Sequence, residues 1–409
     1  MLKMSILFIL FLGVSYLIYG VARTYKINVW QNKVGETLPD TFKIELPVIK
    51  NQDNYFCIKA SINDNDETDF IIDTQASSLA KIETIDDLTA NYWGKYPAPV
   101  SNFYGQKERL SLYFFERFKI QSLSFNKPLF KGILKSNTMY DLMDNDVIGR
   151  DILKQLYWKF SLDDDKMILF SNKDSLLLCK ETGNYVKIKN GLIRNNNPVF
   201  LPDISNQDNF MFDLGYAGEI MVNNKIFTRL SKEFSPKRFL SVRRTSTKID
   251  TTYVFDGMKI EWKGIKIPNC QIIYRPITNR NLIGVELANR FNFVLAYNEK
   301  KNNRIEDNLY LQPRANFQNI KSIPYCSDFG FDIGDLKDGF IIKRIELGGL
   351  ADKAGISLKD KIISINHGNF NLNDAKRLDF YLKDKKSVNV EIEKDGKIIG
   401  KELIINFDD

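Results

Sequence analysis

The feature that most constrains the fold is a motif that occurs twice, an apolar run ending in an aspartate. Residues 70–76 read FIIDTQA, and residues 210–217 read FMFDLGYA. A Lys-Ile pair lies 46 residues beyond each aspartate, and an apolar-apolar-Gly run follows at residues 147–149 and 282–284. Three landmarks in one order at near-equal spacing indicate an internal repeat. The chain therefore contains two similar lobes, which we place at residues 35–180 and 185–315.

The residue pattern of both copies predicts a mainly β protein. After residue 30 the chain consists of short apolar runs rich in Ile, Val, Phe and Tyr, broken by Asn, Asp, Gly and Lys. Each copy ends in two further predicted strands. These are residues 158–162 with 167–170 in the first copy, and residues 293–297 with 309–311 in the second.

The paired aspartates suggest hydrolysis by an activated water. Two carboxylates about 3 Å apart cannot both ionise, so they share one proton. One then acts as a base toward water while the other donates a hydrogen bond to the carbonyl under attack. This chemistry needs no metal, cofactor or histidine. The chain has one histidine, His367, which excludes a multi-histidine metal site and a catalytic triad whose histidine lies elsewhere.

The residues around both aspartates resemble those of retropepsin-like and pepsin-like aspartic proteases. Residues 73–78 read DTQASS, similar to the Asp-Thr-Gly-Ala-Ser-Ser motif of that family, and residues 213–215 read DLG, similar to its second copy. The runs VIG at 147–149 and LIG at 282–284 resemble the strands that thread behind each catalytic loop. The resemblance implies a pair of acid-protease-like β-barrels with Asp73 and Asp213 as the catalytic dyad. It also implies that Thr74 braces the two loops and that Ser77, together with Ser78, orients the Asp73 carboxylate.

Two departures from the family pattern keep a second interpretation open. Gln75 stands where the family has Gly, which we expect to crowd the site. Leu214 stands where the family has Thr or Ser, so one bracing hydroxyl is missing and Thr74 loses its expected mate, although Gly215 is kept. The alternative to an endopeptidase is therefore a catalytically inactive peptide-binding protein. A third interpretation makes both aspartates simple turn formers at the surface.

A flap over the substrate is expected between the first aspartate loop and its threaded strand. Residues 103–106 read FYGQ, a turn between apolar runs in that window, and Tyr104 is the flap candidate. An ordinary exposed hairpin aromatic is the competing interpretation of Tyr104.

The C-terminal segment, residues 325–406, lacks this repeat and resembles a PDZ domain. The resemblance is carried by GFDI at 330–333, GLADKAGI at 349–356 and DKIISIN at 360–366. A PDZ domain binds an extended peptide as an added strand, so Gly330, Phe331, Asp332 and Ile333 are candidate peptide-binding residues. Asp332 disfavours a terminal carboxylate, which leaves internal strand binding open. A helix is expected at 373–382, and His367 is expected in a turn. A pure PDZ scaffold is a further alternative function.

The N-terminus predicts a membrane segment. Residues 4–22 are uncharged, and as a helix 19 residues span about 28 Å, close to the hydrocarbon thickness of a bilayer. We interpret them as a signal-anchor, with a cleavable signal peptide as the rival and a buried helix as the third possibility. Either of the first two places the rest of the chain outside the cytoplasm, and the anchor makes it a single-pass membrane protein.

The net charge limits which partners are expected, and the cysteine spacing limits which metal sites are expected. Lys and Arg total 58 and Asp and Glu 51, giving a net charge of +7 without a concentrated basic block, so a nucleic-acid partner is not expected. A polypeptide substrate or extended peptide ligand is expected instead. The four cysteines have no metal spacing, and they are expected as buried thiols, with at least one disulfide as the alternative. One chain supplies both aspartates, so dimerisation is not required.

Overall fold

A computed structural model of the chain describes most of its residues. The described residues are 2–35, 37–96, 99–101, 107–137, 139–140, 143, 145–193, 195–242, 248–301, 304–336, 339–366, 368–369, 382, 385–394 and 396–405. The protein is mainly β, as the sequence predicts. Two compact units are formed. Unit 1 comprises Met1–Asn196, Met211–Ala217 and Ala288–Ala315, and unit 2 comprises Asn197–Phe210, Gly218–Leu287 and Asn316–Asp409. The second aspartate loop therefore belongs to the same unit as the first.

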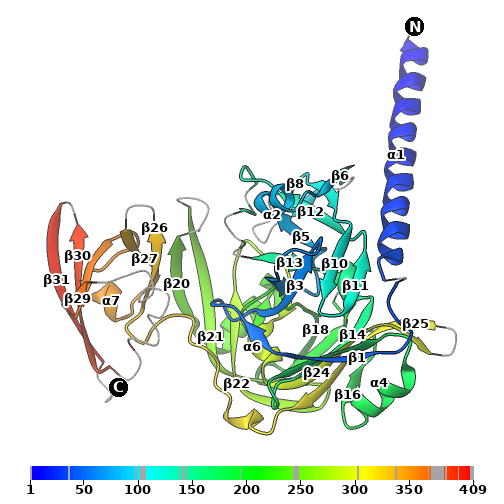
Figure 1. Cartoon of the computed structure of the whole chain (residues 1–409). Helices are drawn as coiled ribbons and strands as arrows, with labels where there is room; N and C mark the ends of the chain where they lie inside the picture. The colour runs from blue at the N-terminus through cyan, green and yellow to red at the C-terminus, as the bar shows by residue number, and fades with distance from the viewer. Residues whose placement is uncertain are drawn as a thin grey trace. The chain divides into compact units, whose positions relative to one another are not determined.

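A six-stranded antiparallel sheet in unit 1 joins the two copies of the repeat (Figure 1). Its central strands pair with each other, and the rings of Phe160 and Phe293 stack across them with centroids 4.4 Å apart. The final strands of both copies were predicted here and are confirmed. The order across the sheet is β1 (Lys43–Pro47), β15 (Lys166–Ser171), β14 (Leu156–Ser161), β24 (Phe291–Lys301), β25 (Arg304–Pro313) and β16 (Val186–Ile188).

One face of this sheet is covered by helix α4 (Ser175–Thr182). The helix begins at Asp174, whose side chain accepts a hydrogen bond from the amide of Leu177, a standard N-cap. Leu178 is buried in a cluster with Tyr157 and Phe170 of the sheet. The sheet is therefore anchored by apolar contacts on the side of α4.

The rest of unit 1 is built around a second sheet. Its strand order is β11-β10-β3-β4-β13-β5-β12-β9-β6, with β2 added beside β3. Its interior is aromatic, with Phe70, Phe118 and Phe130 in mutual contact. The elements are β2 (Ile49–Lys50), β3 (Phe56–Ile62), β4 (Thr68–Ile72), β5 (Leu79–Lys81), α2 (Ile82–Asp87), β6 (Asn91–Lys95), β7 (Val100–Ser101), β8 (Lys107–Glu108), β9 (Ser111–Phe114), β10 (Arg117–Ile120), β11 (Leu123–Asn126), β12 (Leu129–Ile133), β13 (Asp146–Ile148) and α3 (Arg150–Leu153).

Unit 2 contains one long mixed sheet in the order β17-β18-β23-β19-β22-β21-β20-β27-β28-β30-β31. Its first elements are β17 (Asn197–Leu201), η2 (Pro202–Ile204), β18 (Asn206–Phe212, its last two residues in unit 1), β19 (Ile220–Val222), α5 (Asn224–Glu233), β20 (Lys237–Val242), β21 (Ile249–Trp262), β22 (Ile265–Tyr274), β23 (Leu282–Ile283), α6 (Val285–Ala288, its last residue in unit 1) and η3 (Phe317–Asn319).

The C-terminal part of unit 2 has a hydrophobic core of its own. Phe329, Ile342, Val390 and Leu403 are among its buried members. Its elements are β26 (Phe331–Leu336), β27 (Gly339–Glu346), α7 (Leu350–Lys353), β28 (Lys361–Ile365), β29 (Gly368–Asn369), β30 (Ser387–Lys394) and β31 (Lys397–Ile404). Strand β27 also pairs with β20, so the sheet continues into this part. His367 and residues 373–381 of the predicted helix lie outside the described residues.

Helix α1 (Leu2–Lys33) occupies the N-terminus and continues well past the predicted end at residue 22 (Figure 1). Among the residues that the structure describes, no helix combines the length and the apolar character needed to cross a membrane. The predicted membrane-spanning helix is therefore without structural support. The continuation beyond residue 22 has a physical cause, because Ile27 buries its apolar side chain in a cluster with Leu112 and Leu129.

All four cysteines are present as thiols. Cys57, Cys270 and Cys326 are buried, whereas Cys179 is exposed on α4. Burial raises the pKa of the Cys57 thiol to about 11, so this group stays protonated at neutral pH. Three of the four therefore have the buried environment that the sequence predicted.

Candidate active site

The first aspartate loop begins where β4 ends. Strand β13 runs parallel to β4, and the amide of Asp73 donates to the carbonyl of Ile148 at 3.0 Å. The chain then turns sharply, because Asp73 Oδ1 accepts hydrogen bonds from the amides of Gln75 at 2.7 Å and Ala76 at 2.8 Å. The loop is thus folded around the carboxylate that it presents.

Gly149 closes the back of this loop. A Cβ atom at this position would lie 2.2 Å from the carbonyl carbon of Ser77 and 2.4 Å from the amide nitrogen of Ser78, so no side chain fits. The amide of Gly149 donates to Ser78 Oγ at 3.0 Å. The threaded strand therefore contacts the aspartate loop through backbone and through a buried serine.

The second aspartate loop follows β18 and meets the first at Gly215. Asp213 Oδ1 accepts a hydrogen bond from the amide of Gly215 at 3.0 Å. A Cβ atom on Gly215 would lie 2.2 Å from Asp73 Oδ2, so the Asp73 carboxylate rests against the α-carbon of this glycine. Both carboxylates therefore contact one residue, within unit 1.

Thr74 cross-links the two loops from a fully buried position. Its hydroxyl donates to the carbonyl of Phe212 at 2.9 Å and accepts from the amide of Leu214 at 3.1 Å. Both partners are main-chain groups, the carbonyl of residue 212 and the amide of residue 214, so neither hydrogen bond depends on the side chain at position 214. The sequence-based expectation that Leu214 leaves Thr74 without a mate is therefore not what the structure shows. Leu214 itself is buried as a core side chain.

Gln75 takes part in the same brace. Its side-chain amide donates to the carbonyl of Phe212 at 2.8 Å, so this oxygen accepts from both Gln75 and Thr74. A carbonyl has two lone pairs, and both are used here. The side chain thus adds a hydrogen bond between the loops in the place where the sequence suggested crowding.

The surroundings of Asp73 disfavour its charged form. Burial raises the pKa of Asp73, and the two amides that donate to its Oδ1 oppose that shift only in part. Asp213 is also buried. The phenol of Tyr297 on β24 lies nearby, and its pKa is raised chiefly by burial, with smaller contributions from the charges of Asp307, Asp73 and Asp213. Among the described residues its hydroxyl has no hydrogen-bond partner.

Sequence reasoning missed Asp151, which supports the first loop. This buried carboxylate accepts hydrogen bonds at 2.9 Å from both the amide and the hydroxyl of Ser78. The signal that points to it is its place directly after Gly149 and Arg150. Ser78 therefore braces the loop from behind, through Asp151 and Gly149.

Lys131 was also missed. It lies on β12 with only 7% of its surface exposed, its ammonium is 3.1 Å from Ser77 Oγ, and it lies 3.9 Å from the ring centre of Tyr96. Burial lowers its pKa to about 8, while the charge of Asp151 acts in the opposite direction. A lone lysine inside the apolar run LFKGI at 129–133 is the sequence signal for such a group.

The remaining predicted site residues lie elsewhere. Tyr104 falls outside the described residues. The residues from Gly330 to Ile333 belong to unit 2, at the start of β26. Asp332 Oδ1 accepts from the amide of Ile333 at 2.9 Å, and its other oxygen is 3.4 Å from the guanidinium of Arg344. Phe331 is buried in the core of that part.

Comparison with known proteins gives structural neighbours only. A retropepsin-like aspartic protease from Rickettsia conorii is 20% identical, with 32% of this chain and 93% of that chain covered and a TM-score of 0.23. The HtrA-type protease AlgW with decapeptide is 9% identical over 55% of this chain and 79% of that one, with a TM-score of 0.20. A variant of AlgW with decapeptide is 8% identical over 79% and 96%, with a TM-score of 0.19. No protein-family model and no curated protein matches the chain.

Proposed function

We propose that this protein is an aspartic-type endopeptidase in which Asp73 and Asp213 activate a water molecule. The observation that carries the proposal is the meeting of both carboxylates at Gly215, on loops that Thr74 joins through two buried hydrogen bonds. Two carboxyl groups held in this way favour a state with one proton between them.

The chemistry follows from that state. The ionised carboxylate takes a proton from water as the water oxygen bonds to the carbonyl carbon of the scissile peptide. The protonated carboxyl donates its proton to the carbonyl oxygen. The tetrahedral intermediate then collapses: one of its hydroxyls returns a proton to the second carboxylate as the C=O bond re-forms, the C–N bond breaks, and the amine leaves with the proton that the first carboxylate had taken up. The two carboxyl groups lie on loops that Thr74 holds together, and this fixed geometry supplies the orientation that the proton transfers require.

The proposal includes a second site for peptides in unit 2. Strand β26 pairs with β27 along one edge, and among the described residues no strand pairs with its other edge. An extended peptide would add there in the manner of a PDZ domain. Because the Asp332 carboxylate already accepts from the amide of Ile333, an internal strand fits this position better than a terminal carboxylate. Tethering by residues 4–22, with the rest of the chain outside the cytoplasm, completes the proposal.

A specific observation favours a second candidate function, a peptide-binding protein without catalysis. Gln75 brings a side chain into the loop where aspartic proteases have glycine, and its amide is bonded to Phe212. Turnover by the purified protein would eliminate this candidate.

The deciding experiment compares Asp73→Asn and Asp213→Asn with Asp87→Asn, an exposed aspartate in α2 of the same unit. The substrate is an unfolded protein, and cleavage is followed by mass spectrometry of the products. We expect the first two variants to lose about 10³-fold in kcat or more, and the third to keep wild-type kcat. Full activity in Asp73→Asn or Asp213→Asn would overturn the proposal. Inhibition by a peptide isostere carrying a central hydroxyl is expected for the wild type.

A further inference from the structure

The last turns of α1 are part of the core of unit 1. Ile27 is only 2% exposed and packs against Leu112 and Leu129 of the second sheet. Trp30 donates its indole N–H to the carbonyl of Lys127 at 2.8 Å, and its ring contacts that of Phe114 at a centroid distance of 5.6 Å. These contacts fix the helix end against the lobe that carries Asp73.

The opposite side of the same helix faces solvent. Val21 is 63% exposed and Tyr25 is 71% exposed. One face of the helix is therefore buried and the opposite face is exposed, as expected for a helix that packs on one side. The contrast provides matched positions for a test.

Gln31 extends this contact to the aspartate loop. Its side-chain amide donates to Asp151 Oδ2 at 3.3 Å, and its carbonyl accepts from the side chain of Gln155 at 3.0 Å. The other oxygen of Asp151 accepts both hydrogen bonds from Ser78. One buried carboxylate thus joins the N-terminal helix to the loop of Asp73.

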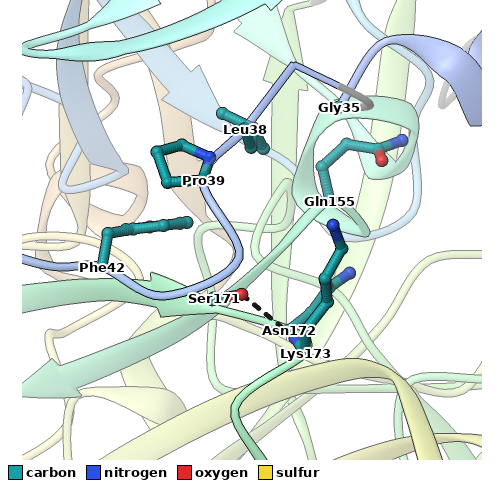
Figure 2. Close-up of a pocket in the computed structure, with 8 residues that line it drawn as sticks. All are labelled: Gly35, Leu38, Pro39, Phe42, Gln155, Ser171, Asn172 and Lys173. Atoms are coloured by element: carbon teal, nitrogen blue, oxygen red, sulfur yellow. Dashed lines mark hydrogen bonds between the residues drawn. The ribbon is translucent and has the colours of Figure 1, made fainter.

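The segment after the helix is also held in place. The carbonyl of Val34 accepts from the amide of Asn126 at 3.1 Å. A Cβ atom on Gly35 would lie 2.6 Å from Gln155 Oε1, so the chain passes close over this side chain. Beyond it, a cavity of about 240 Å³ is lined by this segment together with Gln155 and the end of β15. Figure 2 shows its lining by Gly35, Leu38, Pro39, Phe42, Gln155, Ser171, Asn172 and Lys173.

We propose that the end of α1, residues 23–33, is a positioning element of the candidate active site, acting from Gln31 through Asp151 to Ser78. This rests on the proposed function and adds a regulatory consequence. A cut before Arg23 leaves the element in place, whereas loss of residues 23–33 removes one partner of Asp151 and uncovers Leu112 and Leu129. The N-terminal helix is then more than a leader or a tether.

The test uses the full chain with single substitutions. Gln31→Met keeps the length of the side chain but removes the donor to Asp151, and Trp30→Ala removes the packing. Tyr25→Ala, on the exposed side of the helix, is the matched control. We expect kcat to fall about tenfold in Gln31→Met and further in Trp30→Ala, with KM changed less than twofold, because the loop is displaced while the substrate contacts stay. Tyr25→Ala should match the wild type.

A second readout separates this inference from the proposed function. Hydrogen exchange of residues 73–78 reports directly on the hydrogen bonds of the loop, whether or not the protein cleaves peptides. We expect faster exchange at the Ser78 amide in Gln31→Met at an unchanged melting temperature, and no change in Tyr25→Ala. Wild-type exchange and wild-type kcat in both Gln31→Met and Trp30→Ala would overturn the inference. Absence of cleavage by the wild type would instead overturn the proposed function.

Discussion

Replacing Gly215 by alanine tests the geometry on which the proposed mechanism depends. A Cβ atom there would lie 2.2 Å from Asp73 Oδ2 and 2.5 Å from its Cγ. Non-bonded carbon and oxygen atoms do not approach so closely, so one of the two aspartate loops must move. The neighbouring atom belongs to a carboxylate whose other oxygen is held by the amides of Gln75 and Ala76, which prevents a simple rotation away.

The size of the effect follows from that distance. Restoring an ordinary contact requires a displacement of about 1 Å, and a misplacement of this size at reacting groups costs about 100-fold in rate. We therefore expect kcat of Gly215→Ala to fall about 100-fold. The loss should appear equally in kcat/KM, because the interaction removed is one made in the transition state.

Gly183→Ala is the matched control, because it lies in the same unit and its new Cβ would be 3.6 Å from the nearest atom, the carbonyl oxygen of Cys179. Steady-state cleavage of a fluorogenic peptide gives kcat and KM, and thermal unfolding checks that both variants fold. A folded Gly215→Ala protein with wild-type kcat would refute the view that the two carboxylates meet at this glycine.

Three further predictions concern the same site. Thr74→Val should lower the free energy of unfolding by about 1–3 kcal/mol in denaturant titrations, because the buried amide of Leu214 loses its acceptor while the carbonyl of Phe212 keeps the hydrogen bond from Gln75; Thr74→Ser keeps the hydroxyl and should lose much less. Asp73→Asn should unfold at a higher temperature than the wild type at pH 7. Since burial raises the Asp73 pKa, ionisation of this group destabilises the fold, and the difference should shrink as the pH falls and the carboxyl becomes protonated. Lys131→Met should remove a rise in stability above pH 8, which in the wild type amounts to on the order of 3 kcal/mol by pH 10.5, since a lysine whose pKa is about 8 in the folded state sheds its proton there before the unfolded chain does. An unchanged pH profile of stability in that variant would contradict the assigned burial of the ammonium.

Much of the β framework is predictable from local pattern. The apolar runs at 158–162 and 293–297 are predicted as strands near the end of each repeat, and in the structure they pair as β14 and β24 at the centre of one sheet. The turn at Asp73 is readable as well, because an aspartate after an apolar run folds the next residues around its own carboxylate. These features depend on residues that are close in sequence, so they can be predicted from the sequence alone.

The support of the loops is not predictable in this way. Leu214 suggests a missing partner for Thr74, yet the partners are main-chain atoms that no side-chain motif records. Gln31, Asp151 and Ser78 are separated by 120 and 73 residues, and nothing in their local sequence links them. Their contact depends on where three distant elements pack.

The sequence by itself determined that the chain is mainly β, that it repeats, and that each copy carries an aspartate at the end of a buried strand. Only the tertiary structure decided that residues 211–217 join the unit of Asp73, that Gly215 contacts both carboxylates, and that the end of α1 contacts Asp151, the carboxylate that supports the first loop. The physical reason is the range of the interactions. Hydrophobic alternation and turn chemistry act between near neighbours in the chain, whereas close packing and buried hydrogen bonds act between whichever groups the folded backbone brings together.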